Sequence, residues 1–328
     1  MAYSEAVLQK AQARLAQARE ENERETSARI EGIYVRYPRL REIDSQLRET
    51  SARIMAVSFR RGEDPASAME ALKKENLALQ QEREWILESG DLDPDDLVKT
   101  PICPSCGGTG YVGAVMCSCL KELCRQEQKK ELSALLGAGR ESFDRFRLDV
   151  YPAEYDQRLG QSPRTLMQYV YSNAVHYAKT FTPASGSLLF IGATGLGKTF
   201  LSACIARAVA DRGYSVVYDT AGHVFSEFEA AKFGPRGDDG AARTRKYLEC
   251  DLLILDDLGT EMTTQFVVSA LYQLVNTRLL EQRPSLISTN IPVAELETRY
   301  SAQIASRLLG VYEVYKFVGS DVRRLPKP

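Results

Sequence analysis

The sequence predicts an α/β fold with a parallel sheet in the C-terminal part of the chain, preceded by an α-helical N-terminal region and a small cysteine-rich module. Three observations support this prediction. Short apolar runs alternate with helix-like segments after about residue 163, residues 1 to about 90 are rich in Ala, Glu, Arg, Gln and Leu, and four cysteines lie between positions 103 and 119. Apolar strands that alternate with helices are typical of a parallel sheet covered on both faces.

The composition indicates a folded chain with more than one domain. At 328 residues, of which 44% are hydrophobic, the chain can bury a sizeable core. We expect a helical, coiled-coil-like region at 1–95, the cysteine-rich module at 96–135 and the α/β domain at 136–328. The acidic, proline-containing segment 88–101 marks the first boundary.

Charge and hydropathy limit the surroundings and the partners of the chain. The net charge of −2 gives no overall affinity for a polyanion, so a nucleic-acid contact would need a local basic patch. No apolar run approaches the roughly 18 residues that span a bilayer, and the first residues lack the features of a secretory signal. We therefore expect a cytoplasmic protein, in which clustered cysteines favour metal binding over disulfides.

Prolines divide the N-terminal region into three predicted helices, because Pro38 and Pro65 interrupt a run that is nearly free of glycine. Such helices need partners if they carry an apolar stripe. The middle one has apolar residues at three- and four-residue steps: Leu40, Ile43, Leu47, Ile54 and Val57. A helical hairpin within the chain and a coiled coil between chains both fit, since the pattern lasts under three heptads.

The segment GATGLGKT at 192–199 matches the phosphate-binding loop pattern G-x-x-x-x-G-K-[ST]. It lies between the apolar run LLFI and the helix-compatible run FLSACIARAVA, as that loop requires. Its glycines let backbone N–H groups and a helix N-terminus point at phosphates, while Lys198 can reach the terminal phosphates and Thr199 can bind Mg²⁺. The predicted nucleotide contacts are Gly192, Ala193, Thr194, Gly195, Leu196, Gly197, Lys198 and Thr199.

A second apolar run ends in two carboxylates. In LLILDDLG, Asp256 and Asp257 follow four apolar residues, which places them at the C-terminal edge of a central strand beside the phosphate loop. We expect Asp256 to hold Mg²⁺ through water and Asp257 to polarise the attacking water, a position at which many ATPases carry Glu. Asn290 ends a third strand, LISTN, where it could orient that water; a turn-forming asparagine is the alternative.

In chain order, the phosphate loop, LLILDDLG, ISTN, IASRLLG and the terminal FVGSDVRR resemble the AAA+ ATPase module of the DnaC/DnaI-type bacterial helicase loaders. The same motifs resemble the IstB-type transposition ATPases to a lesser degree. The resemblance covers about residues 140–326, and the cysteine cluster after a helical segment is similar to the DnaI-like loaders. It implies an AAA+ P-loop NTPase that binds ATP and couples slow hydrolysis to helicase loading in DNA replication initiation.

The resemblance also implies roles for two arginines and a set of partners. Arg307 in IASRLLG matches the arginine finger that reaches the ATP of a neighbouring subunit, and Arg323 in FVGSDVRR matches the arginine that contacts the γ-phosphate within the chain. The residues alone would make both of them solvated charges. The implied partners are a hexameric replicative DNA helicase, single-stranded DNA and further copies of the chain, which associate through the ATPase domain.

A basic and aromatic segment is the candidate DNA contact. FEAAKFGPRGDDGAARTRKYLEC mixes cations with an aromatic side chain, a combination that suits phosphate neutralisation and base stacking. Lys232 and Phe233 are the predicted DNA-binding residues. Asp238 and Asp239 dilute the positive charge, so a solvated loop is at least as good an interpretation.

Four cysteines in two close pairs predict a zinc site. Cys103-x2-Cys106 and Cys117-x-Cys119 can deliver four thiolates to one tetrahedral ion, and the glycines between the pairs free the backbone to wrap it. Four protein ligands leave no open position for water, so the predicted role is structural. Cys124 is a spare that could replace one ligand, and a redox pair or a set of free thiols is the alternative to zinc.

Two other functions compete with helicase loading. An IstB-type ATPase partner of a transposase shares every ATPase motif, although the cysteine module argues against it. An adaptor that uses nucleotide only as a binding switch shares the same loop and carboxylates, but it does not depend on hydrolysis.

Overall fold

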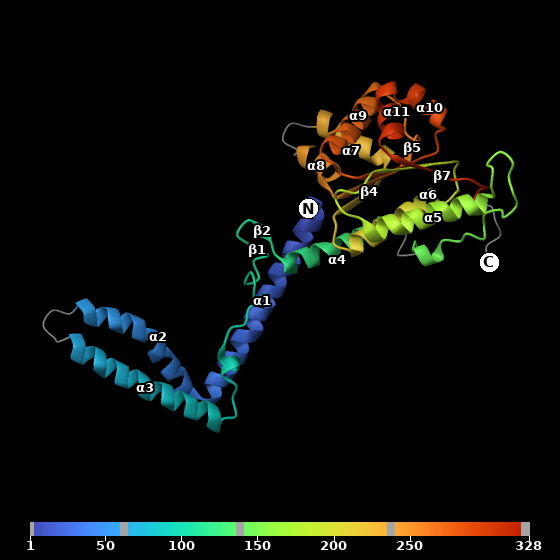
Figure 1. Cartoon of the computed structure of the whole chain (residues 1–328). Coiled ribbons are helices and arrows are strands. Elements are labelled where there is room, and N and C mark those ends of the chain that lie inside the picture. The colour runs from blue at the N-terminus through green and yellow to red at the C-terminus, as the bar shows by residue number, and fades with distance from the viewer. Residues whose placement is uncertain (1–2, 60–64, 136–140, 235–239, 323–328) are drawn as a thin grey trace. The chain divides into compact units, whose positions relative to one another are not determined.

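A computed structural model of the chain describes residues 3–59, 65–135, 141–234 and 240–322 (Figure 1). The chain divides into two compact units, one of Arg14–Cys117 and one of Met1–Ala13 with Ser118–Pro328. Helix α1 (Glu5–Arg36) contributes residues to both units. Among the described residues, no helix combines the length and the apolar composition that a bilayer crossing requires.

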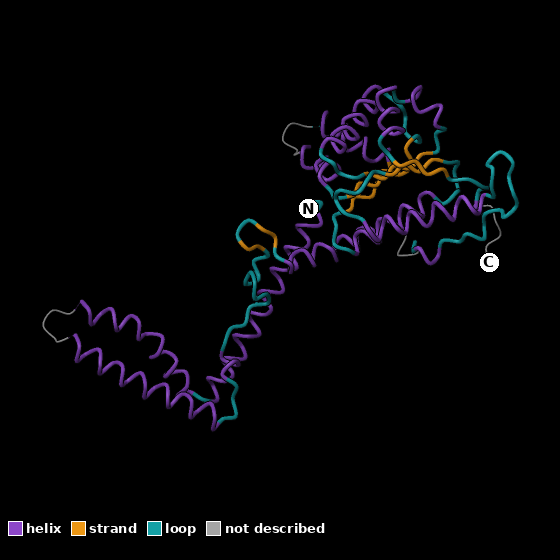
Figure 2. Tube along the Cα trace, viewed as in Figure 1, coloured by secondary structure: helices purple, strands orange, loops and turns teal. Residues whose placement is uncertain are grey.

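The smaller unit contains a helical hairpin of α2 (Pro38–Phe59) and α3 (Pro65–Ser89), drawn side by side in Figure 2. Each helix begins at a proline, which suits the first turn because an N–H there has no helical partner to lose. Their shared buried core consists of Leu40, Ile43, Leu79, Ile86 and Leu87. Of the two predicted arrangements, the structure therefore has the hairpin within the chain; Ile54 and Val57 lie outside the side chains that it describes.

The segment after α3 runs along α1. It begins with a short 3₁₀ turn, Pro94–Leu97, after which Asn22 of α1 donates to the Thr100 carbonyl at 2.8 Å. Two short strands, β1 (Tyr111–Val112) and β2 (Val115–Met116), then form an antiparallel pair between the two cysteine pairs. These contacts fix a segment that has few apolar residues to bury.

The larger unit is built on a five-stranded, all-parallel sheet with the order β4-β5-β6-β3-β7. Strand β3 is an inner strand that pairs with β6 on one side and with β7 on the other. The carboxyl ends of parallel strands meet at one edge of a sheet, where ligands of α/β proteins bind. The strand bounds are β3 Leu188–Ile191, β4 Val216–Thr220, β5 Leu252–Leu258, β6 Ser285–Thr289 and β7 Glu313–Lys316.

Helices cover both faces of this sheet (Figure 1), as the apolar strands predict. Alternate residues of a strand face opposite sides, so Leu252 and Ile254 pack into one core and Leu253 and Leu255 into the other. The first core is covered by α4 (Ser118–Leu135), α5 (Pro163–Thr180) and α6 (Lys198–Asp211). The second is covered by α7 (Ala221–Phe233), α8 (Gly240–Glu249), α9 (Gln265–Leu280), α10 (Val293–Arg299) and α11 (Ala302–Gly310).

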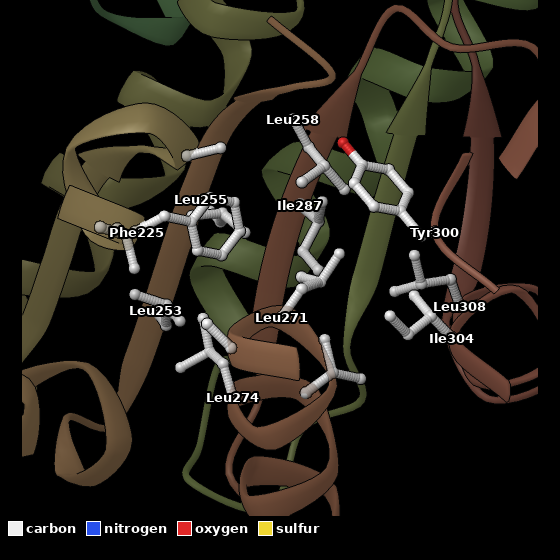
Figure 3. Packing of buried hydrophobic residues seen from close by; sticks show 14 of the residues in the cluster. Phe225, Leu253, Leu255, Leu258, Leu271, Leu274, Ile287, Tyr300, Ile304 and Leu308 are labelled. Carbon is white, nitrogen blue, oxygen red and sulfur yellow. The ribbon is translucent and has the colours of Figure 1, made fainter. Parts of the chain in front are cut away.

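The second core joins elements that are far apart in the chain. Figure 3 shows Leu271 and Leu274 of α9 meeting strand residues such as Leu253 and Ile287. Side chains of α7 and α11 close the same cluster. Burial of side chains of this size stabilises a fold by about 1.5–3 kcal/mol each relative to exposure, so this cluster is a principal source of stability for the unit.

A buried arginine connects α9 to the amino ends of the neighbouring strands β5 and β6. Arg278 is fully buried, and its guanidinium donates to the carbonyls of Tyr247 (2.8 Å), Cys250 (3.1 Å) and Pro284 (2.6 Å). It also donates from Nε to Ser285 Oγ at 2.9 Å. Cys250 and Pro284 immediately precede the region where β5 and β6 begin, so these hydrogen bonds both compensate the buried charge and align the two strands.

Candidate nucleotide site and cysteine centre

The phosphate-binding loop joins the end of β3 to the start of α6. Gly195 and Gly197 have φ values of 81° and 90°, a left-handed conformation that glycine adopts without a Cβ clash. The helix begins at Lys198, which is 4% exposed and donates from Nζ to the carbonyls of Gly192 (2.7 Å) and Ala193 (2.9 Å). The loop therefore has the shape of an anion cradle at a helix N-terminus, with its lysine folded back onto it.

Segments outside the motif hold the loop in place. Tyr151 donates its hydroxyl to the Leu196 carbonyl at 2.8 Å, and the Val322 N–H donates to the Gly195 carbonyl at 3.0 Å. A Cβ on Gly192 would lie 2.6 Å from the Phe317 carbonyl, so the end of β7 leaves room there only for glycine. Arg323, the predicted γ-phosphate contact, lies outside the described residues.

The two predicted carboxylates lie at the end of β5. Asp256 is 2% exposed and accepts a 2.6 Å hydrogen bond at Oδ2 from the Tyr218 hydroxyl and another at Oδ1 from the Ser288 hydroxyl. Burial and the neighbouring Asp256 raise the pKa of Tyr218 far above its usual value, so the tyrosine stays protonated and donates. Asp257 is exposed and has a φ of 55°. The structure thus places one carboxylate inside the protein and the other at its surface.

Asn290 and Arg307 occupy different surroundings. Asn290 directly follows β6 and is exposed, at the same edge of the sheet as the phosphate loop. Arg307 on α11 donates to Asn276 Oδ1 and to the Tyr272 hydroxyl of α9, each at 3.1 Å, and its guanidinium lies 4.8 Å from the centre of the Tyr272 ring. Within this chain, Arg307 is therefore held against α9 by hydrogen bonds and a cation–π contact.

The predicted DNA-binding residues belong to an aromatic cluster that the sequence did not reveal. Phe233 is 67% exposed, and its ring lies 5.7 Å from that of Phe266 at the start of α9. Lys232 Nζ lies 5.5 Å from the centres of both rings. A hollow of about 330 Å³ beside them is lined by α7, α8 and α9 residues that include Phe228 and Gln273. Phe266 is 33 positions beyond Phe233, so no local pattern could have connected them.

Comparison with known proteins finds a family that is similar to this part of the chain. Residues 160–310 match the family model described as IstB-like ATP binding protein. This part of the chain is therefore similar to an IstB-like ATP-binding domain. The five-stranded parallel sheet, with a phosphate loop after β3, confirms the predicted α/β P-loop fold.

Individual relatives of the ATP-binding domain include proteins of two kinds. The chain is 26% identical over 137 residues to the replicative helicase loader DnaC of Escherichia coli (strain K12). These aligned residues make up 42% of this chain and 56% of DnaC. It is 28% identical over 122 residues to a provisionally named insertion sequence ATP-binding protein of Sinorhizobium fredii. These aligned residues make up 37% of this chain and 40% of that protein. The chain thus spans about half the length of the curated relatives that it matches.

A solved structure of the DnaC helicase loader also aligns with this chain. The alignment covers 55% of this chain and 98% of that one, with 18% identity and a TM-score of 0.46. The cysteine pairs lie before residue 160 and are therefore outside the region that the family model matches.

The four predicted cysteines meet in space. The sulfur atoms of Cys103, Cys106, Cys117 and Cys119 all lie within 4.8 Å of one another, and the Cys103 and Cys117 sulfurs are 3.7 Å apart. Four thiolates around one zinc at about 2.3 Å would have their sulfurs about 3.8 Å apart, so the donor set and its spacing fit this metal. The Gly110 N–H also points at the Cys106 sulfur, at 3.3 Å, as expected for a thiolate ligand.

Cys124 is separate from this group. It is fully buried on α4, and burial raises the pKa of its thiol to about 11. A protonated, buried thiol is a poor metal ligand. The structure therefore favours the four cysteines of the two pairs over any set that includes Cys124.

The four converging cysteines predict how much zinc the chain binds. The purified chain is expected to contain about one zinc per molecule by elemental analysis, because four converging thiolates bind zinc tightly. Cys103→Ser should lose most of this zinc, since it removes a buried ligand. Cys124→Ser is the matched control and should keep it. Full zinc content in Cys103→Ser, or none in the unaltered chain, would contradict a zinc site at these four residues.

Proposed function

We propose that the chain is an ATP-dependent loader of a replicative DNA helicase onto single-stranded DNA. One observation carries the proposal: a phosphate loop and two acidic residues meet at one edge of an IstB/DnaC-like sheet, in a chain that also has a helical hairpin and a four-cysteine module. The relative DnaC, named as a replicative helicase loader, supports this choice. The hairpin and the cysteine module favour a loader over an insertion-sequence ATPase.

The site residues divide the ATPase chemistry among them. Lys198 exchanges its bonds to the loop carbonyls for bonds to the terminal phosphates, and Thr199 and Asp256 would hold Mg²⁺. When bound, Mg²⁺ neutralises charge on the phosphates. Asp257 polarises the attacking water, and Asn290 orients it from the neighbouring strand. Arg323 contacts the γ-phosphate from the same chain.

Arg307 gives ATP a role in assembly. In the proposed assembly, copies of the chain associate through the ATPase domain, and Arg307 leaves its contacts with Tyr272 and Asn276 to reach the ATP of a neighbouring copy. A guanidinium is suited to that role because it stays charged and offers several donors in a fixed plane. Hydrolysis would then release the association.

Asp257→Asn should separate ATP binding from hydrolysis. We expect turnover, measured as phosphate release, to fall at least about 100-fold, because the amide cannot accept the water proton. Asparagine tolerates the left-handed backbone of this position, so binding of a fluorescent ATP analogue should change less than about twofold. The exposed Asp211→Asn is the control. Unchanged turnover, combined with unchanged helicase release, would favour the nucleotide-switch alternative.

The helical hairpin is the proposed contact with the helicase. Trp85 of α3 is 68% exposed and Leu77 of the same helix is 51% exposed. Large apolar side chains at the surface, tryptophan above all, are frequent anchors of protein interfaces. The surface of α3 therefore offers a binding face that does not involve the ATP site.

Co-purification tests this assignment. The full-length chain should retain the replicative helicase of its own organism, and Trp85→Ala should weaken retention about tenfold or more, because an interface anchor is lost. Leu280→Ala, at a 77% exposed position of the other unit, should have little effect. Retention of a transposase in place of the helicase would overturn the assignment in favour of the insertion-sequence alternative.

We propose that Lys232, Phe233 and Phe266 contact single-stranded DNA. The exposed ring of Phe233 and the half-buried ring of Phe266 offer stacking surfaces, and the ammonium group beside them can neutralise a phosphate. This arrangement does not depend on base identity. It suits a protein that must accept any sequence at the point of loading.

Stacking predicts a specific loss of DNA affinity. Phe233→Ala and Phe266→Ala should each weaken binding of a labelled oligothymidylate, measured by fluorescence anisotropy, by about 1–3 kcal/mol. Tyr169→Ala removes another exposed aromatic ring and serves as the control. Wild-type affinity in both phenylalanine variants would contradict a stacking platform at this site.

A further inference from the structure

We propose that Tyr218 and Ser288 are positioning residues for the ATP site: together they fix the Asp256 carboxylate in the orientation that Mg²⁺ requires. Neither residue belongs to the phosphate loop or to the acidic motif. The inference rests on the proposed role of Asp256 in holding Mg²⁺. Tyr218 and Ser288 would act on the metal only through the Asp256 side chain, which they hold in position.

The Asp256 carboxylate is held at both oxygens. Oδ2 accepts from the Tyr218 hydroxyl at 2.6 Å, and Oδ1 accepts from the Ser288 hydroxyl. Tyr218 is 8% exposed, and Ser288 is fully buried. Hydrogen bonds to a carboxylate are short and strong, and two donors on opposite oxygens oppose rotation of the group about its terminal bond. Each oxygen has a second lone pair, so the carboxylate can still accept from Mg²⁺-bound water.

The strands explain why these donors reach Asp256. Thr220 of β4 is the register partner of Asp256, and Tyr218 lies two residues earlier on the same strand. Residues two apart on a strand share a face of the sheet, and the length of a tyrosine side chain spans the remaining distance. On the other side of β5, Ser288 comes from β6. The Asp256 carboxylate on β5 therefore accepts hydrogen bonds from both neighbouring strands, β4 and β6.

Ser288 also occupies an irregularity in the ladder between β5 and β6. The register passes from Leu255↔Ile287 to Leu258↔Thr289, so β5 has one residue more than β6 over this stretch. Ser288 Oγ accepts the Asp257 N–H at 3.0 Å while its own proton is donated to Asp256. One hydroxyl thus supports both acidic residues, and it holds the chain where Asp257 takes its left-handed backbone.

The expected effect follows from residues that orient metal ligands elsewhere. Changes to such partners typically lower metal affinity about 10- to 100-fold while the ligand itself remains. Tyr218→Phe removes one donor and keeps the buried ring. Ser288→Ala removes the donor on the other oxygen together with the acceptor for Asp257. Both should therefore raise the Mg²⁺ concentration that nucleotide binding requires, and saturating Mg²⁺ should restore binding.

The experiment measures binding of a fluorescent ATP analogue by the full-length chain as Mg²⁺ is titrated, with thermal unfolding to confirm that each variant is folded. Tyr218→Phe should shift the Mg²⁺ midpoint about 10-fold or more, with binding at saturating Mg²⁺ within about twofold of the unaltered chain. Tyr247→Phe is the matched control, because its buried hydroxyl donates at 2.8 Å to a different carboxylate, that of Asp219. This control should keep the original midpoint.

Two results would be decisive against the inference or its basis. An unchanged Mg²⁺ midpoint in folded Tyr218→Phe and Ser288→Ala would overturn the positioning role and leave the proposed ATP site intact. Nucleotide binding that does not respond to Mg²⁺ in the unaltered chain, or to Asp256→Asn, would instead overturn the role of Asp256 and the inference with it. Ser288→Thr retains the hydroxyl, so a midpoint near the original value in that variant would separate hydrogen bonding from packing.

Discussion

The position of β3 in an all-parallel sheet is the constraint on which the ATP-binding domain depends. Because β3 lies between β6 and β7, the loop that leaves it emerges beside the carboxyl end of β6 and one strand away from that of β5. A phosphate cradle, two carboxylates and an amide therefore share one edge although they are up to 98 positions apart. The buried cores on both faces of the sheet, with Arg278 at the opposite edge, keep these strands aligned.

Regular pairing is interrupted at the place where the acidic residues lie. Asp256 keeps its regular register with Thr220 of β4 and faces the hydroxyls of its neighbours, whereas the extra residue in β5 lies where Asp257 is exposed with a left-handed backbone. Such a backbone is costly for most residues and persists where the surrounding structure over-determines it. Here the serine hydroxyl supplies the hydrogen bonds that the interrupted ladder does not. Two adjacent carboxylates therefore have different environments, one buried and one exposed.

The smaller unit reaches stability by other means. Its hairpin buries a short row of apolar side chains and adds ion pairs such as Arg83 with Asp44, at 2.7 Å. The segment that follows has little apolar surface to bury. Hydrogen bonds to α1, such as that from Asn22 to the Thr100 carbonyl, and the antiparallel pair of β1 with β2 hold it in place.

The sequence by itself determined the features that depend only on residues close together in the chain. The phosphate loop, Asp256 with Asp257, the paired cysteines and the prolines that begin α2 and α3 each depend on neighbours a few positions away. Strand β7, the Tyr218 hydroxyl, the place of Phe266 and the partners of Arg307 were not predicted. They arise from contacts between segments 30 or more positions apart, which local periodicity does not record. The tertiary structure also decided between the hairpin and the coiled coil, because both bury the same apolar stripe.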